Sequence, residues 1–598
     1  MLPWFLRRPE RLAAERQGIE ALSQSAGWLV GHVWQLEDDL CLDAVVRAHD
    51  HDYELRVKFP SFYPDAPSVV YPRNMRVRLS QHQYGGADGP LCLEWGPDNW
   101  HRDVTAAMML TSAYRLLDAE NPMGLDKSEA QIDVPSRHQL TIGQELRGEW
   151  ARWHYGTALE AYFKTQPLAA RGSFRFSFRS LADNWTALVH SAALLDGGMA
   201  WTDPDVPQTI PGAEPDALYC GAWFKTELTS SVLLSVGDLE ALRRVLIPLD
   251  GMTLLARDGT SPIEGLQRSI AGALVCDKQD MLHLFTILPR NSLVHCATIR
   301  EEQVANNLRA PDHAVLEHEK VGIVGLGSAG SKIALALARM GVRSFYLVDH
   351  DLMMASNLQR HALDWQSVGQ HKVDAAAKAL SLVAASAEVK TSRIHLTGQE
   401  SNAAISGVLQ RLSACDLIID ATANSRVFNL LAAVTTEADI SMVWLEVFGG
   451  GIGGMMARSR PGLDPSPQDM RVSYLQYCSD NPAPPALRKS ADYAVSGTKG
   501  EVLVASDADI GVIAHHAARF ASDCMTFPES SQYPYSMYLI GLTEAWVFDA
   551  PFAAIPISPS APSRSERQAE ALPALRTEDE AFLSQLFKEK DDGPTSAS

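Results

Sequence analysis

The sequence predicts a multidomain protein in which an N-terminal α+β domain precedes a middle α/β domain and a C-terminal α/β domain with a parallel sheet. The length of 598 residues corresponds to about three or four domains, each large enough to bury a core. Residues 28–59 alternate apolar and polar side chains between polar turns, as antiparallel strands do. From Lys320 onward strands and helices alternate, which favours a parallel sheet covered by helices on both faces.

Composition and charge exclude several classes of protein. Hydrophobic residues make up 46% and charged residues 21% of the chain, which is typical of folded globular proteins. The net charge of −20 argues against a broad surface for nucleic acid or for an anionic membrane. No run of about 18 apolar residues occurs, and residues 1–8 place apolar before basic side chains, the reverse of a signal peptide. We therefore expect a soluble, cytoplasmic protein.

The first domain is expected over residues 1–160. A proline that suits a first helical turn begins an amphipathic helix over 9–26, and the alternating strands follow it as a meander. A proline-rich stretch over 59–72 then leads to a loop that contains Cys92 and to a helix over 104–117. Together these elements form an α+β domain.

The middle domain is expected over residues 161–308. It contains short strand-like runs at 231–236 and 281–288 between glycines and prolines, without a cluster of residues that indicates chemistry. We interpret it as a structural or partner-binding domain. The C-terminal domain follows over 309–557, and residues 558–598 are rich in Pro, Ser, Glu and Lys, which predicts a mobile tail.

A glycine-rich loop opens the C-terminal domain. Gly325, Gly327 and Gly330 form a GxGxxG pattern between a buried strand and a helix, and Asp349 closes the next strand. Such glycines allow close backbone approach to a phosphate, the helix N-terminus supplies N–H groups, and the acid suits a ribose hydroxyl. The pattern predicts a nucleotide site for NAD, FAD or ATP.

Polar residues after the second strand distinguish between these nucleotides. Asn357 and Arg360 lie in NLQRH, and Lys372 ends VGQHK. A dinucleotide needs little beyond the ribose carboxylate, whereas a triphosphate carries several negative charges that Arg and Lys neutralise in the transition state. The cluster therefore favours ATP.

These motifs together resemble the ThiF/MoeB-like adenylation domain of ubiquitin-activating enzymes over roughly residues 310–550. The resemblance implies that the C-terminal carboxylate of a small protein attacks ATP, with Mg²⁺ as cofactor, to give an acyl-adenylate and pyrophosphate. It also implies a set of nucleotide-binding residues. These are Gly325, Gly327, Ser328 and Gly330 at the phosphates, Asp349 on the ribose, Asn357, Arg360 and Lys372 on the phosphates, and Arg309 reaching the ATP of a partner subunit.

Two features depart from that family. Its D-x-T-D-N segment, where an aspartate holds Mg²⁺, reads Asp420-Ala-Thr-Ala-Asn here, so Ala423 replaces the second acid. Either Asp420 takes the metal or the metal is held differently. The family's zinc cysteines are also absent, because the eight cysteines of this chain form no CxxC pair, which equally argues against a disulfide framework.

The surroundings of Cys92 resemble the ubiquitin-conjugating enzyme core over about residues 5–135. His82 lies ten residues before Cys92, where that family's His-Pro-Asn motif begins, and Trp100 lies eight residues after it, at the family's tryptophan. The resemblance implies a cysteine that accepts an acyl group by thioester exchange and holds it for an amine. His-Pro-Asn has become His-Gln-Tyr, so either the Tyr84 hydroxyl replaces the asparagine or the acyl group is transferred with another geometry.

An activating enzyme usually carries a cysteine of its own. Cys478 lies in a proline-rich crossover over 461–506, which is the family's usual place, and Cys524 lies at the far end of a helix over 509–520. We favour Cys478, followed by Cys524, and direct transfer from the adenylate to Cys92 remains a third route. Cys415 begins a strand and is assigned to the core.

The order of the domains resembles the fused activating-conjugating proteins found beside cGAS-like nucleotidyltransferases in bacterial anti-phage CBASS operons. That resemblance implies attachment of the nucleotidyltransferase C-terminus to an amine on a target, a homodimer, and a middle segment related to an inactive adenylation domain. Two other hypotheses stay open. One is an NAD- or FAD-dependent oxidoreductase, and the other is a non-catalytic scaffold for a ubiquitin-like partner, motivated by Ala423 and Tyr84.

Overall fold

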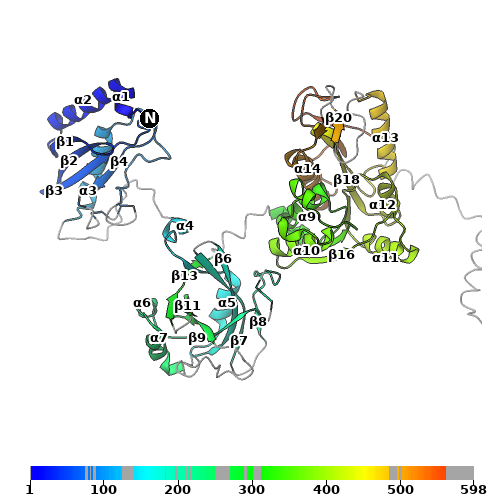
Figure 1. The fold of residues 1–598 in the computed structure, drawn as a ribbon, viewed down its shortest axis with the longest axis horizontal. Coiled ribbons are helices and arrows are strands. Elements are labelled where there is room, and N and C mark those ends of the chain that lie inside the picture. The colour runs from blue at the N-terminus through cyan, green and yellow to red at the C-terminus, as the bar shows by residue number, and fades with distance from the viewer. Residues whose placement is uncertain are drawn as a thin grey trace, which may run out of the picture. The chain divides into compact units, whose positions relative to one another are not determined.

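The computed structural model divides the chain into two compact units, Met1–Gly148 and Glu149–Ser598. Among the described residues, the second unit contains two large sheets and a small sheet of two strands, β20 (Ala494–Ser496) and β21 (Val502–Val504). The N-terminal unit and the two large sheets are described in turn (Figure 1). The structure describes residues 2–74, 79–80, 82–84, 89–123, 141–181, 184–195, 200–210, 212–214, 217–249, 270–288, 292–300, 311–483, 494–496 and 502–559.

The N-terminal unit is an α+β structure with an antiparallel meander of four strands in the order β1-β2-β3-β4, as the sequence predicts. The side chains of Ile19, Leu55 and Leu110 are fully buried, so helix and strand residues share one core. Thr105 caps the last helix by accepting a hydrogen bond from Met108 N. The elements are α1 (Trp4–Arg7), α2 (Pro9–Ser25), β1 (Leu29–Leu36), β2 (Leu40–Ala48), β3 (His51–Lys58), β4 (Val69–Pro72) and α3 (Ala106–Glu120).

A buried carboxylate joins the segments of this unit. Glu15 on α2 is fully buried and lies 2.7 Å from the guanidinium of Arg11. It also accepts hydrogen bonds from the Tyr63 hydroxyl and, at 2.8 Å, from Ala106 N at the start of α3. A buried charge is tolerated only when it is paired and hydrogen-bonded, so this cluster fixes α2, the proline-rich turn and α3 relative to one another.

The middle sheet has the order β12-β11-β10-β9-β6-β7-β5-β13, with β8 paired to β7. The first unit ends at Gly148, earlier than the expected boundary at residue 160, because β5 already pairs with β7 and β13. The last helix of the first unit is α4 (Ile142–Glu145). The elements of the middle part are β5 (Ala151–Tyr155), α5 (Thr157–Thr165), β6 (Arg171–Leu181), β7 (Asn184–Leu194), β8 (Trp201–Thr202), β9 (Tyr219–Lys225), α6 (Ser230–Leu234), α7 (Leu239–Val245), η1 (Ile247–Leu249), β10 (Ile270–Cys276), β11 (Leu282–Leu288), β12 (Ser292–His295) and β13 (Ala297–Arg300).

One strand expected in the middle domain is wrong. The run 281–288 forms β11, but most of the run 231–236 belongs to the short helix α6. Leu233 is buried there, while Val232 and Leu234 are exposed. A short apolar run does not distinguish a strand from a helix without tertiary contacts.

The C-terminal sheet has the order β16-β15-β14-β17-β18-β19-β22-β23. Its first five strands are parallel and the last three antiparallel, so the predicted parallel sheet is confirmed for β14 to β18 and gains an antiparallel edge. The elements are η4 (Pro311–Glu317), β14 (Lys320–Val324), α9 (Ser328–Met340), β15 (Ser344–Val348), η5 (Ala355–Gln359), η6 (Trp365–Ser367), α10 (Lys372–Val383), β16 (Glu388–Ser392), α11 (Asn402–Leu412), β17 (Leu417–Asp420), α12 (Ser425–Glu437), β18 (Ser441–Val447), η7 (Gly449–Gly451), β19 (Gly453–Ser459), α13 (Pro467–Asp480), β20 (Ala494–Ser496), β21 (Val502–Val504), α14 (Asp507–Thr526), β22 (Met537–Gly541) and β23 (Ala554–Pro556).

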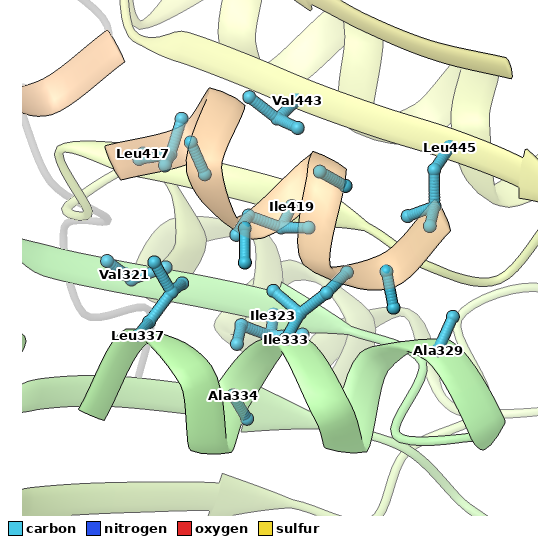
Figure 2. Packing of buried hydrophobic residues seen from close by; sticks show 14 of the residues in the cluster. Val321, Ile323, Ala329, Ile333, Ala334, Leu337, Leu417, Ile419, Val443 and Leu445 are labelled. Carbon is cyan, nitrogen blue, oxygen red and sulfur yellow. The ribbon is translucent and has the colours of Figure 1, made fainter. Parts of the chain in front are cut away.

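Two apolar cores cover the two faces of this sheet. On one face the β14 residues Val321 and Ile323 pack against Ile333 and Leu337 of α9, and α14 joins the same core (Figure 2). On the other face α11 and α12 bury residues such as Leu431. The predicted helices on both faces are therefore confirmed. Burying apolar side chains on both sides holds the strand ends, and the loops that follow them, in fixed positions.

Two further sequence expectations concern residues outside this description. Residues 560–598, most of the expected tail, and Arg309 lie outside the described residues. Among the described helices, none combines the length and the apolar character needed to cross a membrane.

Candidate functional site

A pocket of about 220 Å³ lies at the carboxyl ends of β14, β15 and β17. The chain continues from β14 to β15 on one side and reaches β17 on the other side, so these ends mark a switch in strand order. Open α/β sheets bind ligands at such a position because the loops diverge there and leave a crevice. We call this the strand-end pocket.

The glycine loop forms one wall of the strand-end pocket. Gly325 has a φ of 89°, and a Cβ at this position would lie 2.8 Å from Cγ2 of Thr422. A Cβ on Gly330 would lie 1.9 Å from the carbonyl oxygen of Gly325, so no larger residue fits without moving the loop. Gly327 lines the pocket, and no atom lies within 4 Å of where its Cβ would be.

Helix α9 begins at this wall without a capping side chain. Its N-cap residue is Gly327, and Ser328 is its first residue. The first N–H groups of a helix have no partner within the helix and carry a partial positive charge. The open glycine cradle and this uncapped start together fit a phosphate group.

Asp349 lines the pocket next to the glycine loop. Its Oδ2 accepts a hydrogen bond of 2.6 Å from Leu326 N in that loop, and its Oδ1 accepts one of 2.8 Å from Asp351 N. The carboxylate thus connects the ends of β14 and β15. Carboxylate oxygens accept more than one hydrogen bond, so this position is compatible with the predicted role on a ribose.

Lys372, the first residue of α10, brings a buried positive charge to the pocket. Its side chain is 10% exposed, and its Nζ lies 2.8 Å from Oδ2 of Asp351. The lysine holds the pKa of Asp351 below its usual range, against the opposite effect of burial, which is the largest single influence on that pKa. The ammonium therefore has one anionic partner that an incoming phosphate can share or replace.

The remaining predicted nucleotide residues do not line the pocket. Ser328 and Gly330 belong to the first turn of α9, next to the wall. Asn357 accepts a hydrogen bond of 2.8 Å from Met354 N through its side chain, which holds the turn η5. The backbone N of Arg360, just after η5, donates to the carbonyl oxygen of Asn357 at 2.9 Å. These residues support the loop beside the pocket.

Sequence reasoning missed two histidines in the pocket wall. The rings of His350 and His395 stack with their centroids 4.0 Å apart, and both residues line the pocket. A Cβ on Gly398 would lie 2.3 Å from Nδ1 of His395, so that glycine permits the ring position. His350 directly follows Asp349 and was detectable from the motif, but His395 reaches the site only through the pairing of β15 with β16.

Asp420, the predicted metal ligand, is buried and does not line the pocket. Its Oδ1 accepts hydrogen bonds from the backbone N of Thr422 at 3.0 Å and from its hydroxyl at 2.6 Å. Burial raises the pKa of Asp420 to about 6. The arrangement fits a structural carboxyl that shapes the turn before α12 better than a metal ligand. Ala423, where the resemblance expects an acid, has a φ of 50° in this turn.

In the N-terminal unit, two short segments bring His82, Tyr84 and Cys92 together. Cys92 N donates to the carbonyl oxygen of His82 at 2.7 Å, and Tyr84 N donates to that of Pro90 at 2.9 Å. Leu91 N also donates to Val70 O in β4, which attaches the pair to the sheet. The structure therefore places these three residues on two segments that pair with each other.

The chemistry around Cys92 is that of a thiol beside a phenol. The residue is 5% exposed. Burial raises the pKa of Tyr84 to about 12, with smaller contributions from Cys92 and Asp98. A phenol with that pKa keeps its proton at neutral pH and acts as a hydrogen-bond donor. Trp100 closes the segment by donating from Nε1 to the Pro64 carbonyl at 2.8 Å.

The two candidate cysteines of the C-terminal domain differ in accessibility. Cys478 lies on helix α13, within the expected proline-rich crossover, and it is half-buried. Cys524 lies inside α14, is 3% exposed and belongs to the apolar core. Burial raises the pKa of both thiols. A thiol fixed in a packed core is inert, so the structure distinguishes the two positions.

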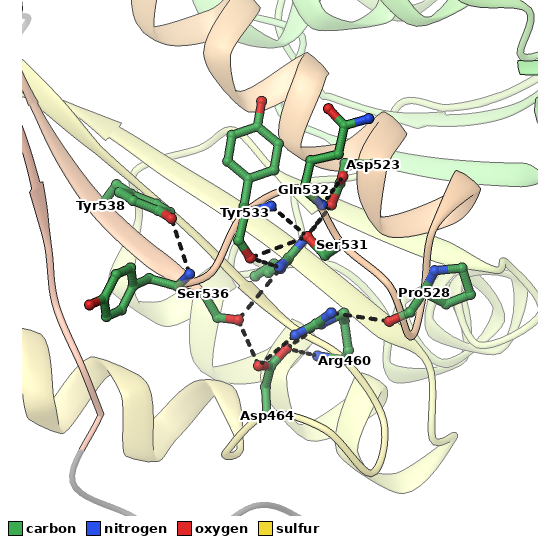
Figure 3. Close-up of polar contacts among 11 residues, drawn as sticks. Arg460, Asp464, Asp523, Pro528, Ser531, Gln532, Tyr533, Ser536 and Tyr538 are labelled. Atoms are coloured by element: carbon green, nitrogen blue, oxygen red, sulfur yellow. Dashed lines mark hydrogen bonds and ion pairs between the residues drawn. The ribbon is translucent and has the colours of Figure 1, made fainter. Parts of the chain in front are cut away.

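A polar network fixes the surroundings of Cys524. Its neighbour Asp523 pairs with the fully buried Arg458 at 2.7 Å and accepts a hydrogen bond from Ser531. Close by, Arg460 binds Asp464 at 2.8 Å and the carbonyl oxygen of Pro528 at 3.0 Å (Figure 3). Paired buried charges of this kind resist rearrangement, because breaking one pair leaves the other charge uncompensated.

A sequence model of the ThiF family matches residues 301–500. The ATP-dependent ubiquitin transferase-like protein Cap2 of Enterobacter hormaechei is 34% identical over 147 residues, which cover 23% of this chain and 24% of that protein. Ubiquitin-like modifier-activating enzyme 5 of Aedes aegypti is 28% identical over 155 residues, covering 25% of this chain and 38% of that protein. The chain thus spans about a quarter of the length of the Cap2 relative that it matches. The residues that line the strand-end pocket all lie within the part of the chain that matches the ThiF model.

Among solved structures, Escherichia coli MccB with AMPCPP and MccA is similar at a TM-score of 0.30 and 15% identity, covering 42% of this chain and 66% of that chain. The structure of PaaA is similar at a TM-score of 0.32 and 16% identity, covering 41% of this chain and 75% of that chain.

Proposed function

We propose that this protein activates the C-terminal carboxylate of a partner protein with ATP and transfers the resulting acyl group through cysteine thioesters to an amine. One observation carries the proposal: in a region that matches the ThiF family, the open glycine cradle, the uncapped start of α9 and the buried Lys372 meet at one pocket. A phosphate-bearing substrate fits that set of donors.

The activation step is a displacement at the α-phosphorus of substrate ATP. A carboxylate oxygen of the partner protein forms a bond to that phosphorus while its bond to the bridging oxygen breaks, and pyrophosphate leaves with the electron pair. The N–H groups at the start of α9 and the ammonium of Lys372 stabilise the charge that develops on the phosphate oxygens. Asp349 orients the ribose and keeps the glycine loop in place.

The same donors argue for ATP over NAD or FAD. Besides Lys372, a second cation, Arg360, lies in the loop after η5, and the proposal places its side chain on the phosphates of ATP. Hydride transfer between a dinucleotide and a substrate gains little from so many positive charges, whereas pyrophosphate departure requires them. An oxidoreductase would also leave the Cys92 segment without a role.

Mg²⁺ belongs to the proposal as a partner of the phosphates of ATP. Mg²⁺ is commonly held by one or two carboxylates together with substrate phosphates. Asp420 does not fit such a ligand in this structure, because it is buried and bound to Thr422. The steps above therefore rest on the protein's own cations and N–H groups.

After activation, a thiolate attacks the acyl carbon, AMP leaves, and a thioester forms. We propose Cys478 as the first acceptor, because Cys524 is enclosed in the core. The acyl group then passes by thioester exchange to Cys92, whose segment resembles that of a conjugating enzyme. An amine attacks the Cys92 thioester, the thiolate leaves, and the amine loses its proton. The Tyr84 hydroxyl supplies the hydrogen bond to the transient oxyanion, and His82 holds the backbone of Cys92.

We propose a cGAS-like nucleotidyltransferase as the acyl donor and an amine-bearing protein as the target, in anti-phage defence. The similarity to proteins named Cap2 supports this choice. The resemblance also supports a homodimer in which Arg309 reaches the ATP of the partner subunit.

ATP–pyrophosphate exchange tests the activation step. The full chain is incubated with MgATP, labelled pyrophosphate and purified candidate donors. Wild type is expected to exchange label with the correct donor, and Lys372→Ala is expected to reduce exchange at least about 100-fold, because it removes a charge at the phosphates. Lys378→Ala, an exposed lysine on the same helix, serves as the matched control. Absence of exchange with every donor would contradict the proposal.

Intact-mass and non-reducing gel analysis tests the transfer steps. With MgATP and the donor, wild type is expected to form an adduct that reducing agent removes, and Cys92→Ser one that survives it as an oxyester. Cys478→Ala distinguishes the routes: loss of the Cys92 adduct supports two thioesters, whereas an unchanged adduct supports direct transfer from the adenylate. Loss with Cys524→Ala but not with Cys478→Ala would reverse the assignment of the first cysteine.

A further inference from the structure

Lys332, which no predicted role uses, lies on the second turn of α9 with its side chain 10% exposed. Its Nζ donates to the carbonyl oxygen of Arg360 at 2.7 Å and to that of Ser328 at 3.3 Å. It also forms an ion pair of 2.7 Å with Asp507, the first residue of α14. An ammonium has three N–H donors, and three acceptors surround this one.

This saturation argues against a direct role on phosphate. A phosphate oxygen would have to displace one of three acceptors from Lys332, whereas Lys372 has a single carboxylate partner at the pocket. The contacts of Lys332 instead connect three segments that are distant in sequence: the first turn of α9, the loop after η5 and the start of α14.

Two neutral contacts also attach the loop after η5 to the glycine loop and to α9. A ring nitrogen of His361 lies 2.7 Å from the Leu326 carbonyl oxygen, and Ala362 N donates to Ser331 Oγ at 3.3 Å. Burial lowers the pKa of His361, so its ring is neutral near pH 7. The charge-assisted bond from Lys332 is therefore the strong one of the three, because bonds from ionised donors are about twice as strong as neutral ones.

We infer that Lys332 is a positioning residue for nucleotide binding: it fixes the backbone of Arg360 beside the glycine loop, and Asp507 orients its ammonium. The inference rests on the proposed function, since it assigns Arg360 to the phosphates of ATP. A residue that acts through Arg360 affects the triphosphate and leaves the nucleoside part of the ligand unaffected.

Binding of MgATP and of adenosine to the full chain, each measured by calorimetry, tests the inference. Lys332→Met is expected to weaken ATP binding about tenfold and adenosine binding less than about twofold, because a charge-assisted contact near the phosphates is lost. In an Arg360→Ala background the same change is expected to have almost no further effect on ATP. Lys332→Arg should restore part of the affinity.

A second variant covers the case in which Lys332→Met fails to fold. Asp507→Asn removes only the half-exposed partner and leaves Lys332 in place. It is expected to weaken ATP binding about threefold without changing adenosine binding, as for a partly solvated ion pair. Equal loss of ATP and adenosine affinity in these variants, or additive effects of Lys332→Met and Arg360→Ala, would overturn the inference. Wild type that binds no ATP would instead overturn the proposed function, and the inference with it.

Discussion

The two candidate sites of this protein are built in different ways. The strand-end pocket is assembled from the ends of neighbouring parallel strands, the glycine loop before α9 and the first residue of α10. The Cys92 site is assembled from two short segments outside the regular strands, joined by single backbone hydrogen bonds. The first relies on a sheet with apolar cores on both faces, and the second on a local pairing attached to β4.

The difference shows how a reaction can be divided within one chain. Electrostatic stabilisation of a phosphate requires hydrogen-bond donors in fixed positions. A sheet with an apolar core on each face holds the loops that carry these donors in place. In the proposed transfer, both donor and acceptor have to reach Cys92. Because Cys92 is only 5% exposed, its segment must open, which a segment outside the sheet can do without breaking strand pairs. Damage to one site is therefore expected to leave the chemistry of the other intact.

The largest expected effect is that of Cys92→Ala, which should remove the activity of one site and leave that of the other unchanged. Cys92→Ala should abolish adduct formation at that residue and change ATP–pyrophosphate exchange by less than about twofold, because exchange needs only the activation step. Parallel exchange and gel assays on one preparation measure both quantities. A large loss of exchange in this variant would show that the two sites are not independent.

The next effect concerns the glycine cradle. Gly330→Ala should weaken ATP binding at least about 100-fold, because the added methyl would lie 1.9 Å from the Gly325 carbonyl and displace the phosphate donors. Gly407→Ala on α11, where the methyl would meet open space, is the matched control. Calorimetric titration measures the affinity of both variants for MgATP. Normal binding by Gly330→Ala would exclude the glycine cradle as the phosphate site.

A moderate effect is expected at Tyr84. Tyr84→Phe should slow transfer from Cys92 about tenfold while the thioester still forms, because one oxyanion donor is lost. Since burial raises the pKa of Tyr84 to about 12, the wild-type advantage should persist from pH 7 to pH 9. Single-turnover transfer to a lysine-bearing acceptor over this pH range provides the measurement. An advantage that disappears as the pH rises to 9 would argue against the phenol as donor.

The smallest effect concerns Asp420. Because burial raises its folded-state pKa to about 6, above that of an unfolded aspartate, folding loses stability as pH rises from about 4 to about 6. Asp420→Asn keeps an acceptor for Thr422 and removes the buried charge. It should raise the free energy of unfolding of the C-terminal domain by about 2 kcal/mol at pH 7 and give no gain below pH 4. Thermal unfolding measures this, and a shift on adding ATP identifies the transition of that domain.

The same variant tests the metal assignment. Mg²⁺-dependent exchange should be retained in Asp420→Asn if the carboxyl is structural. A loss of more than about tenfold with unchanged ATP affinity would show that Asp420 takes the metal after all.

The local parts of both sites were predictable from sequence. Gly325, Gly330 and the start of α9 follow one another along the chain, so a strand-turn-helix motif specifies their geometry without distant contacts. Asp349 and Lys372 were predictable in the same way, because Asp349 directly follows the next strand and Lys372 begins the next helix. The helix over 9–26 and the strand meander were also readable from periodicity.

Other features depended on pairing between distant segments. His395 enters the pocket wall through the position of β16 beside β15, and the antiparallel edge strands arise from pairings made late in the chain. The short helix α6 replaced an expected strand because a brief apolar run carries too little periodicity to decide.

Sequence by itself determined which groups this protein has for chemistry: the glycine loop, Asp349, Lys372 and the cysteines with their spacing. Only the tertiary structure decided which of them reach a common space. The sequence does not distinguish the environments of Cys478 and Cys524, yet Cys478 is half-buried and Cys524 is enclosed in a core. Burial results from the packing of residues that are far apart in the chain. The roles of Asp420 and Lys332 could not be assigned from sequence for the same reason. The groups that contact each side chain determine what its charge contributes.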